Sequence, residues 1–384
     1  MDNHVNLVNP VEKTSRTSRT SRETKTIYDS AGAPLAAEHI NGYLMDGPDV
    51  WVESRTKPIC EVPPFVRGCQ PTDDGNLILT CEEKVALIEK EPQAAPLIRP
   101  FMMGADFIQR KPRYCLWMKN VSPQIIRSCP SVMERVAKVR DFRLDSKKPA
   151  TRAKAETPTL FDDIREPSTD YIALPKVSSE NRKYIPVDYL KRDVIPGDML
   201  FVLSNASLYH FGVLTSSVHM AWMRVVAGRL KSDYRYSANI VYNNFPWPDV
   251  GFNTETQRLE GTEEKSLSES QCLSASVLRQ DSEKSPNLQN SQSPSNESNI
   301  NPLRTSRTSR ELISSTAQSI LDARALYPDS SLADLYDPLT MPIELRKAHA
   351  ANDRAVLAAY GLAPDTPESE IVAHLMKLYQ NLTA

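Results

Sequence analysis

Residues 228–248 (GRLKSDYRYSANIVYNNFPWP) combine cationic and aromatic side chains at close spacing. Arg229, Lys231 and Arg235 alternate with other residues, so an extended strand or a strand-like loop would direct their charged groups to the same side. Cations suit phosphates and guanine edges, and tyrosine hydroxyls suit the nucleic-acid backbone. The spacing predicts a nucleic-acid interface, although the same pattern is also typical of an ordinary edge strand with solvated charges.

Asp233 is the one acidic residue in this segment, and it lies two positions after Lys231. A carboxylate beside phosphate weakens binding. It can, however, accept a hydrogen bond from a cytosine amino group while a lysine donates to the guanine of the same pair. Lys231 and Asp233 are therefore a candidate reader of a G·C pair, and Tyr234 and Tyr236 are candidate contacts to the DNA backbone.

Charge is unevenly distributed along the 384 residues, although the formal net charge is only −2. Between residues 99 and 249, 24 Lys and Arg face 15 Asp and Glu, which gives +9 and leaves −11 for the rest. A basic central module between acidic segments fits a face that binds a polyanion.

The six cysteines show neither a CxxC motif nor the Cys/His spacing of zinc ligands, and we find no signal peptide. Apolar runs are too short to span a membrane. These features predict reduced thiols in a bacterial cytoplasm, no metal site and no membrane contact.

Catalytic motifs are missing from the sequence. It has no strand–G-x-G–helix loop for S-adenosylmethionine or a nucleotide, no G-x-S-x-G and no H-E-x-x-H. Asp49 with Glu82 and Lys84 is too short a match for a metal nuclease. His210 and His219 are more consistent with core or surface histidines than with a Ser/His dyad. The residues alone predict a binding module without catalytic residues, and not a complete enzyme.

Composition divides the chain into five segments, for which we expect an α+β fold. An α/β recognition domain with a mixed or antiparallel sheet precedes a small helical bundle, and two polar, low-complexity segments are disordered. One of these contains TSRTSRTSR, which recurs in part at residues 305–310. The expected segments are 1–26 (disordered), 27–98 (connector, the end of a methyltransferase-like region), 99–249 (recognition domain), 250–311 (disordered insertion) and 312–384 (helical domain).

Periodicity and turn residues predict the elements within these segments. Strands are expected at 50–52, 77–79, 114–118, 171–175, 184–187 and 199–203. Helices are expected at 81–90, 130–143, 219–229, 316–327, 341–360 and 366–382.

Several blocks of sequence are distinctive in their aromatic, Gly and Pro landmarks. They are INGYLMD (40–46), PTDDGNLIL (71–79), IRPFMMGADF (98–107), RYCLW (113–117), LPKVSSENRKYIP (174–186), FGVLTSSVHM (211–220) and residues 228–248. These blocks resemble the C-terminal part of the MmeI-like (type IIL) restriction–modification proteins and related adenine-N6 DNA methyltransferases. Residues 341–362 resemble the C-terminal helical segment of the same family.

In that family a nuclease and a methyltransferase with an [DN]PPY motif precede the target-recognition domain. The resemblance therefore implies a sequence-specific DNA-recognition module whose catalytic domain is absent or separately encoded. It implies no cofactor in this chain, S-adenosylmethionine on the missing or separate domain, and double-stranded DNA and a separate methyltransferase or nuclease chain as partners. Residues 244–247 (NFPW) lack one proline of the motif and stand in the wrong place for a catalytic loop.

The resemblance also implies pairs of positions that each read one base pair. Two pairs join a lysine to an aspartate, which suits G·C, and the arginine of the third can donate to a purine N7. The pairs are Lys231/Asp233, Lys176/Asp198 and Met199/Arg235. Arg229, Arg182 and Lys183 are expected to contact phosphates.

Two alternatives remain open. The chain is the specificity subunit of an active split methyltransferase, or it is a non-functional truncated remnant, which the repeated TSRTSR tract favours.

Overall fold

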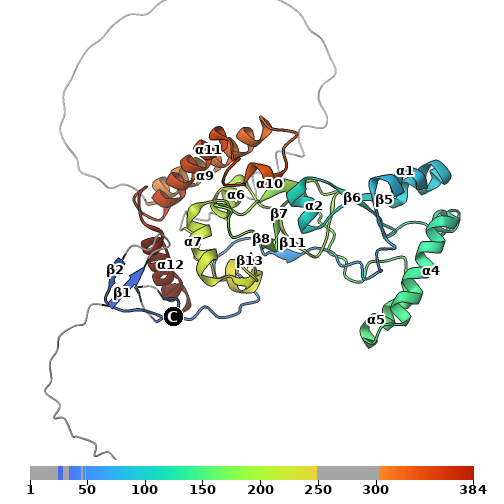
Figure 1. Cartoon of the computed structure of the whole chain (residues 1–384), viewed down its shortest axis with the longest axis horizontal. Helices are drawn as coiled ribbons and strands as arrows, with labels where there is room; N and C mark the ends of the chain where they lie inside the picture. Colours follow the sequence, from blue (N-terminus) through green and yellow to red (C-terminus); the bar gives the residue numbers. More distant parts are fainter. Residues whose placement is uncertain (1–24, 29–33, 45, 48, 249–301) are drawn as a thin grey trace, which may run out of the picture. The chain divides into compact units, whose positions relative to one another are not determined.

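The computed structural model describes residues 25–28, 34–44, 46–47, 49–248 and 302–384 (Figure 1). The chain divides into two compact units, Met1–Val50 and Trp51–Ala384. No helix in the described ranges has the length and apolar character needed to cross a membrane.

The first unit contains an antiparallel hairpin of β1 (Lys25–Tyr28) and β2 (Pro34–Ala37). After it, the Asp46 carboxylate accepts hydrogen bonds from the backbone of Glu38 and His39. We expected a disordered segment up to residue 26, but β1 begins at Lys25, so the predicted boundary is two residues too late. Its other residues lie outside the described ranges.

A mixed sheet in the order β10-β5-β6-β4 begins the second unit. β10 pairs with β5 in parallel and the other pairs are antiparallel, as the expected mixed sheet allows. Phe101, Cys115 and Leu116 of this sheet are buried in its core. The strands are β4 (Ile78–Leu79), β5 (Ile98–Met102), β6 (Arg113–Leu116) and β10 (Ile195–Pro196).

Short helices cover this sheet. Thr80 and Glu83 form a reciprocal capping box that begins the first of them at the predicted residue. In the longest, Val132, Val136 and Val139 face the core at helical spacing. The helices are α1 (Cys81–Lys90), η1 (Pro92–Leu97), α2 (Gly104–Gln109), α3 (Pro123–Arg127), α4 (Pro130–Leu144), α5 (Pro149–Ala153) and η2 (Lys154–Glu156).

A second, antiparallel sheet has the order β3-β11-β7-β9. β7 is buried along its whole length, which confirms the strand predicted at 171–175. The strands predicted at 50–52 and 184–187 are wrong, because both segments are irregular and the latter only leads into β9. The strands are β3 (Val66–Arg67), β7 (Tyr171–Pro175), β9 (Asp188–Leu190) and β11 (Leu200–Ser204).

In the third sheet, residues 229–235 form part of a hairpin instead of the extended strand or strand-like loop that we expected. β12 (Gly228–Leu230) and β13 (Asp233–Arg235) form a hairpin that turns at Lys231 and Ser232, and β13 also pairs with β8 (Val177–Ser178). Arg229, Lys231 and Arg235 therefore lie on two strands and the turn between them, and not along one strand.

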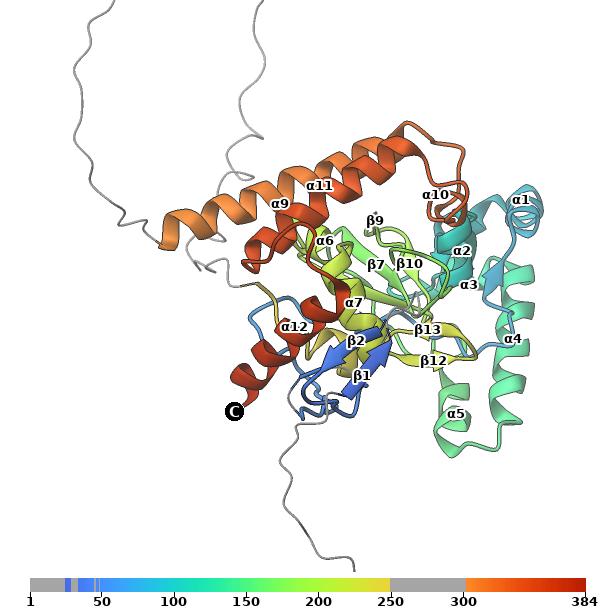
Figure 2. The same cartoon turned by 60° about the vertical axis from the view of Figure 1, so that its left-hand side comes forward.

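Helices α6 and α7 lead from the sheets to the C-terminal helices. An added Cβ on Gly212 of α6 would clash with Ile313, so the glycine permits close packing against α9. Figure 2 shows α9 and α11 side by side. The helices are α6 (Leu208–Leu214), α7 (Ser217–Val226), η3 (Ala238–Tyr242), α9 (Pro302–Ala325), α10 (Leu332–Leu335), α11 (Ile343–Ala359) and α12 (Glu368–Thr383).

Helix α9 begins inside the insertion that we expected to be disordered up to residue 311. The boundary at 312 is therefore too late, and residues 305–310 (TSRTSR) are helical. Residues 250–301 of that prediction lie outside the described ranges. The C-terminal helices confirm the expected α+β class with a small helical bundle.

Buried hydrogen bonds join the bundle to the sheets. The carboxylate of Asp353 accepts from the Tyr184 hydroxyl (2.6 Å) and from the Ser217 amide (2.7 Å). The buried guanidinium of Arg324 donates to the carbonyl of Val187 (2.7 Å). The C-terminal helices therefore share a core with the region that precedes β9.

Candidate nucleic-acid interface

Lys176 lies where the second and third sheets join, between β7 and β8. Its amide donates to the Met199 carbonyl (3.0 Å), and its carbonyl accepts from the Tyr236 amide (2.8 Å). Asp198 and Arg235 are the chain neighbours of those two partners. The structure therefore brings together Lys176, Asp198, Met199 and Arg235, four of the six predicted base-reading residues. We call these four residues and the β12–β13 hairpin the reading edge.

Two glycines position Asp198 and Met199. An added Cβ on Gly197 would overlap the Met103 sulfur, and one on Gly68 would overlap the carbonyl of Gly197. The chain after β3 can approach the end of β10 this closely only because Gly68 lacks a side chain.

The amine of Lys176 lies in a cluster of charges. Its Nζ is 5.1 Å from the centre of the Phe201 ring, and its side chain is half-buried. Burial lowers the pKa of Lys176, Asp198 opposes that shift, and Arg67 and Arg235 reinforce it. Since cations outnumber carboxylates around this amine, an anionic or electron-rich ligand would relieve their repulsion.

Arg67 of β3 was not predicted for the site. Its guanidinium donates to Asp163 (2.7 Å), which also accepts from Arg165 (3.0 Å). Arg67 is more than a hundred positions before Lys176, and only the pairing of β3 with β11 brings them together. No local pattern in the sequence signals such a contact.

Lys231 occupies the tip of the hairpin with its side chain exposed and a φ of 58°. This left-handed conformation favours glycine, so a lysine there stores backbone strain. Arg229 steadies the turn, because its guanidinium donates to the Ser232 carbonyl (2.9 Å) and lies 3.9 Å from the centre of the Tyr234 ring. Exposure leaves the ammonium of Lys231 available to a ligand.

Asp233 ties the hairpin to the loop after β8. Its Oδ1 accepts from the amide of Glu180 (3.3 Å). Burial lowers the pKa of Arg182, and Asp233 and Asp337 oppose that shift, so Arg182 lies in the field of this carboxylate. Lys183 follows in the loop with an exposed side chain. Of these two predicted phosphate contacts, Arg182 therefore lies near Asp233, whereas the Lys183 amine lies 5.2 Å from the centre of the Tyr184 ring.

Tyr234 and Tyr236 are buried, which corrects their prediction as DNA-backbone contacts. Tyr236 is 2 % exposed, and its hydroxyl lies 3.0 Å from Nε2 of His219. Its ring packs against Phe65 and Phe201. Tyr234 is 6 % exposed beneath Arg229. Both rings form the floor under the charged side chains.

The two histidines are core residues, as predicted. Nδ1 of His210 accepts from the Ser207 amide (3.1 Å) at the start of α6. Burial lowers the pKa of His210 to about 4, with a smaller effect of Arg310, and burial lowers the pKa of His219 to about 3. Both rings are neutral at pH 7 and hold structure.

The aromatic end of the segment, residues 242–248, is also buried. The amide nitrogen of Asn244 donates to the carbonyls of Glu53 (2.8 Å) and Asn239 (2.9 Å). Phe245 and Trp247 pack with their ring centres 5.6 Å apart. This stretch holds residues 51–63 against the sheets and presents no catalytic loop.

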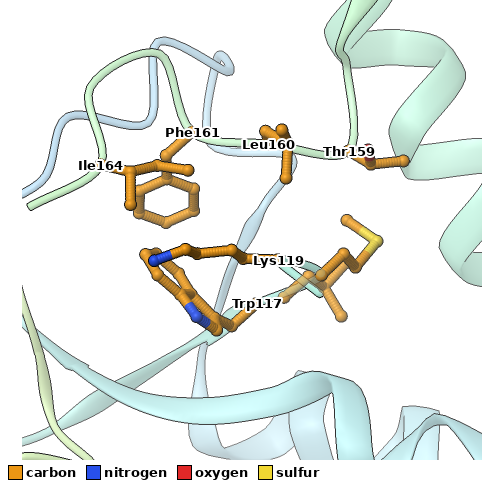
Figure 3. A pocket seen from close by; sticks show the side chains of 8 residues that line it. Trp117, Lys119, Thr159, Leu160, Phe161 and Ile164 are labelled. Carbon is orange, nitrogen blue, oxygen red and sulfur yellow. The ribbon is translucent and has the colours of Figure 1, made fainter. Parts of the chain in front are cut away.

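A small pocket separates the end of β6 from residues 159–164 (Figure 3). Trp117 and Phe161 line it and pack edge to face with ring centres 5.2 Å apart, and the Lys119 amine donates a hydrogen bond to Glu166 (2.8 Å). The described part of the chain has no strand–G-x-G–helix turn and no His, Cys, Asp or Glu cluster that could hold a metal.

Two family models match the chain. The model of the MmeI target recognition domain matches residues 46–249, and that of the MmeI C-terminal domain matches residues 305–384. The first match takes in most of the segment that we assigned to a connector, in agreement with the place of β3 and β4 in the sheets. The second begins within α9.

Two relatives extend these matches. The chain is 34% identical over 345 residues to DNA methyltransferase A of Bacillus subtilis (strain 168), which covers 90% of this chain and 33% of that protein. It also resembles a solved structure of the type IIL restriction-modification enzyme MmeI in complex with DNA, with 37% identity and a TM-score of 0.74 over 94% of this chain and 42% of that one. It thus spans well under two thirds of either relative. The chain belongs to the MmeI family and carries that family's target recognition and C-terminal domains.

Proposed function

We propose that this chain recognises a specific sequence of double-stranded DNA for a restriction–modification adenine-N6 DNA methyltransferase. The observation that carries the proposal is the reading edge, where Lys176, Asp198, Met199 and Arg235 adjoin the Lys231 hairpin. The match to the MmeI target recognition domain and the relative solved with DNA support it.

Each Lys–Asp pair offers one donor and one acceptor to a base pair. In the major groove guanine presents O6 and N7 as acceptors, and cytosine presents an amino donor. Asp233 uses Oδ1 to bind the Glu180 amide, and its Oδ2 has no hydrogen-bond partner in the described ranges. That oxygen would accept from cytosine while Lys231 donates to guanine, and Asp198 and Lys176 would act in the same way.

Phosphate contacts would set the register of the duplex and add no sequence preference of their own. Lys183 and Arg229 are exposed, and Arg182 is partly so. All three adjoin the hairpin or the loop that Asp233 holds.

Methyl transfer belongs to a catalytic part that these residues do not form. S-adenosylmethionine would supply the methyl group there, and the residues of this chain would hold and orient the DNA. Mixing the chain with a separately encoded adenine methyltransferase tests the split-enzyme form of the proposal. Adenine methylation at a sequence selected by this chain is the expected result, and repeated absence of transfer contradicts that form.

The recognition claim is tested by enriching bound sequences from a random duplex library. The wild-type chain should enrich one sequence. Asp233→Asn keeps an oxygen for the Glu180 amide and replaces the free acceptor with a donor, so the preferred base at one position should change.

Asp365→Asn is the matched control, because Asp365 is exposed between α11 and α12. It should leave the enriched sequence unchanged. The proposal fails if the wild-type chain enriches no sequence. The assignment of Asp233 fails if Asp233→Asn and the wild type enrich the same one.

A further inference from the structure

The positive charge of the central module is concentrated away from the reading edge. Residues 99–249 carry a net charge of +9. Residues 127–154, which include α4 and α5, hold nine Lys and Arg against three Asp and Glu, or +6 of that excess. We call residues 127–154 the basic arm. Base reading by the residues of the reading edge does not account for a charge located here.

Buried Arg143 fixes the arm to the rest of the unit. Its guanidinium is fully buried, and burial lowers its pKa while Asp162 and Asp73 oppose that shift. Five carbonyls surround it at 2.8–3.0 Å and satisfy its donors. They belong to Pro71, Thr72, Lys154, Thr157 and Leu160.

A second arginine anchors the other side of α4. Arg135 donates to Glu83 of α1 (2.6 Å) and to the carbonyls of Asn76 and Ile78. The hydrogen bonds of Arg135 and Arg143 hold α4 against the rest of the second unit. The other cations of the arm therefore lie on a helix and turn whose position is fixed.

Three cations in the C-terminal half of α4 and in the segment before α5 face solvent without a partner. Arg140, Lys147 and Lys148 are exposed, and in the part of the chain that the structure describes their side chains make no hydrogen bond or ion pair. By contrast, Lys138 is paired with Glu134 on the same helix (2.8 Å). Unpaired, exposed cations on a fixed support suit a polyanion better than an internal structural role.

The sheet that supports the arm also leads to the reading edge. β10 of this sheet runs directly into Asp198 and Met199. In both views α4 and α5 lie away from α9, α11 and α12 (Figures 1 and 2). A duplex continues beyond any recognised bases as a line of phosphates, about one charge per 1.7 Å of its axis.

We propose that the basic arm binds phosphates of the DNA duplex outside the base pairs that the reading edge recognises. This inference rests on the proposed function and adds a second contact surface to it. Arg140, Lys147 and Lys148 make the contacts, and Arg143 and Arg135 position them. Contacts of this kind add affinity for every sequence and leave the preferred sequence unchanged.

The test is the salt dependence of binding to a long duplex of random sequence, measured with the full chain. Removing the three charges (Arg140→Gln, Lys147→Gln and Lys148→Gln together) should make the negative slope of log K against log salt shallower by about 2 to 3. A control removes three exposed charges from the C-terminal helices: Lys347→Gln, Arg354→Gln and Lys377→Gln. It should leave the slope near that of the wild type.

A second control separates DNA from a protein partner. Phe142→Ser and Leu144→Ser remove exposed apolar side chains from the same arm and no charge. We expect them to leave the slope unchanged. The inference is overturned if the arm triple variant keeps the wild-type slope. It is also overturned if only the apolar variants change the slope.

Sequence enrichment distinguishes this failure from failure of the proposed function. An arm triple variant that binds more weakly but enriches the wild-type sequence supports both claims. If the wild type enriches a sequence and the arm variant keeps its slope, only the arm inference fails. If the chain shows no salt-dependent DNA binding, both fail.

Discussion

The reading edge and the interface between the sheets and the C-terminal helices contain similar residues in opposite surroundings. At the interface, Asp353 and Arg324 are buried and hydrogen-bonded to groups of the sheet region. At the reading edge, Lys231 is exposed in a strained conformation, and Lys176 lies beside two further cations. Polar groups whose bonds are complete within the fold stabilise it, whereas exposed and mutually repelling cations are available to a ligand.

The largest expected effect is on the buried side and depends on pH. The pKa of His210 is lowered to about 4 and that of His219 to about 3, so both favour the neutral, folded form. Their stabilisation is complete above the unfolded pKa of about 6.5 and is lost as the pH falls toward the folded values. Between pH 8 and pH 5 the contribution of these two histidines to the unfolding free energy should fall by on the order of 4 kcal/mol, measured by urea denaturation.

Glutamine is neutral at every pH, so His219→Gln should remove about half of the fall that His210 and His219 cause together. If the variant and the wild type lose equal stability on acidification, His219 does not contribute as described.

Asp353→Ala should have the next largest effect. It leaves the Tyr184 hydroxyl and the Ser217 amide without their acceptor in a buried place, which should cost about 3 kcal/mol of unfolding free energy. Asp353→Asn retains one acceptor oxygen and should cost less. Equal losses in the two variants, compared by urea denaturation, would contradict a role for these two hydrogen bonds.

Changes to the phosphate contacts should have the smallest effects. Lys183→Gln should weaken binding to all sequences alike. It should also make the negative slope of log K against log salt shallower by about 1. Filter binding of matched and mismatched duplexes measures both quantities. A change in the preferred sequence would show instead that Lys183 contacts a base.

Local signals predicted the elements that local chemistry determines. The helix predicted at 81–90 is α1, which begins directly after the Thr80 cap, and the apolar run at 171–175 is β7. The valines of α4 placed its buried face. In each case the periodicity and the end signal lie within a few residues of one another.

The hairpin escaped prediction for a physical reason. Its turn holds Lys231 in a left-handed conformation without the glycine or asparagine that marks such turns. Long-range pairing likewise hid Arg67 and the burial of Tyr236, because β3 and β11 cover that ring from distant parts of the sequence. The family resemblance pointed to the base-reading pairs of the reading edge. The fold then showed that Lys176, Asp198, Met199 and Arg235 lie next to one another.

The most direct test of the account compares the base preferences of two variants, each of which removes one lysine from the reading edge. Lys231→Gly removes the ammonium and relieves the strained φ, and Lys176→Met keeps an apolar stem near Phe201. Sequences would be enriched from one random duplex library with the wild-type chain and both variants.

We predict two G·C positions in the wild-type preference. Each variant should relax a different one, with a loss of about 1–3 kcal/mol in discrimination there. The same enriched sequence from all three proteins would contradict base reading by this edge.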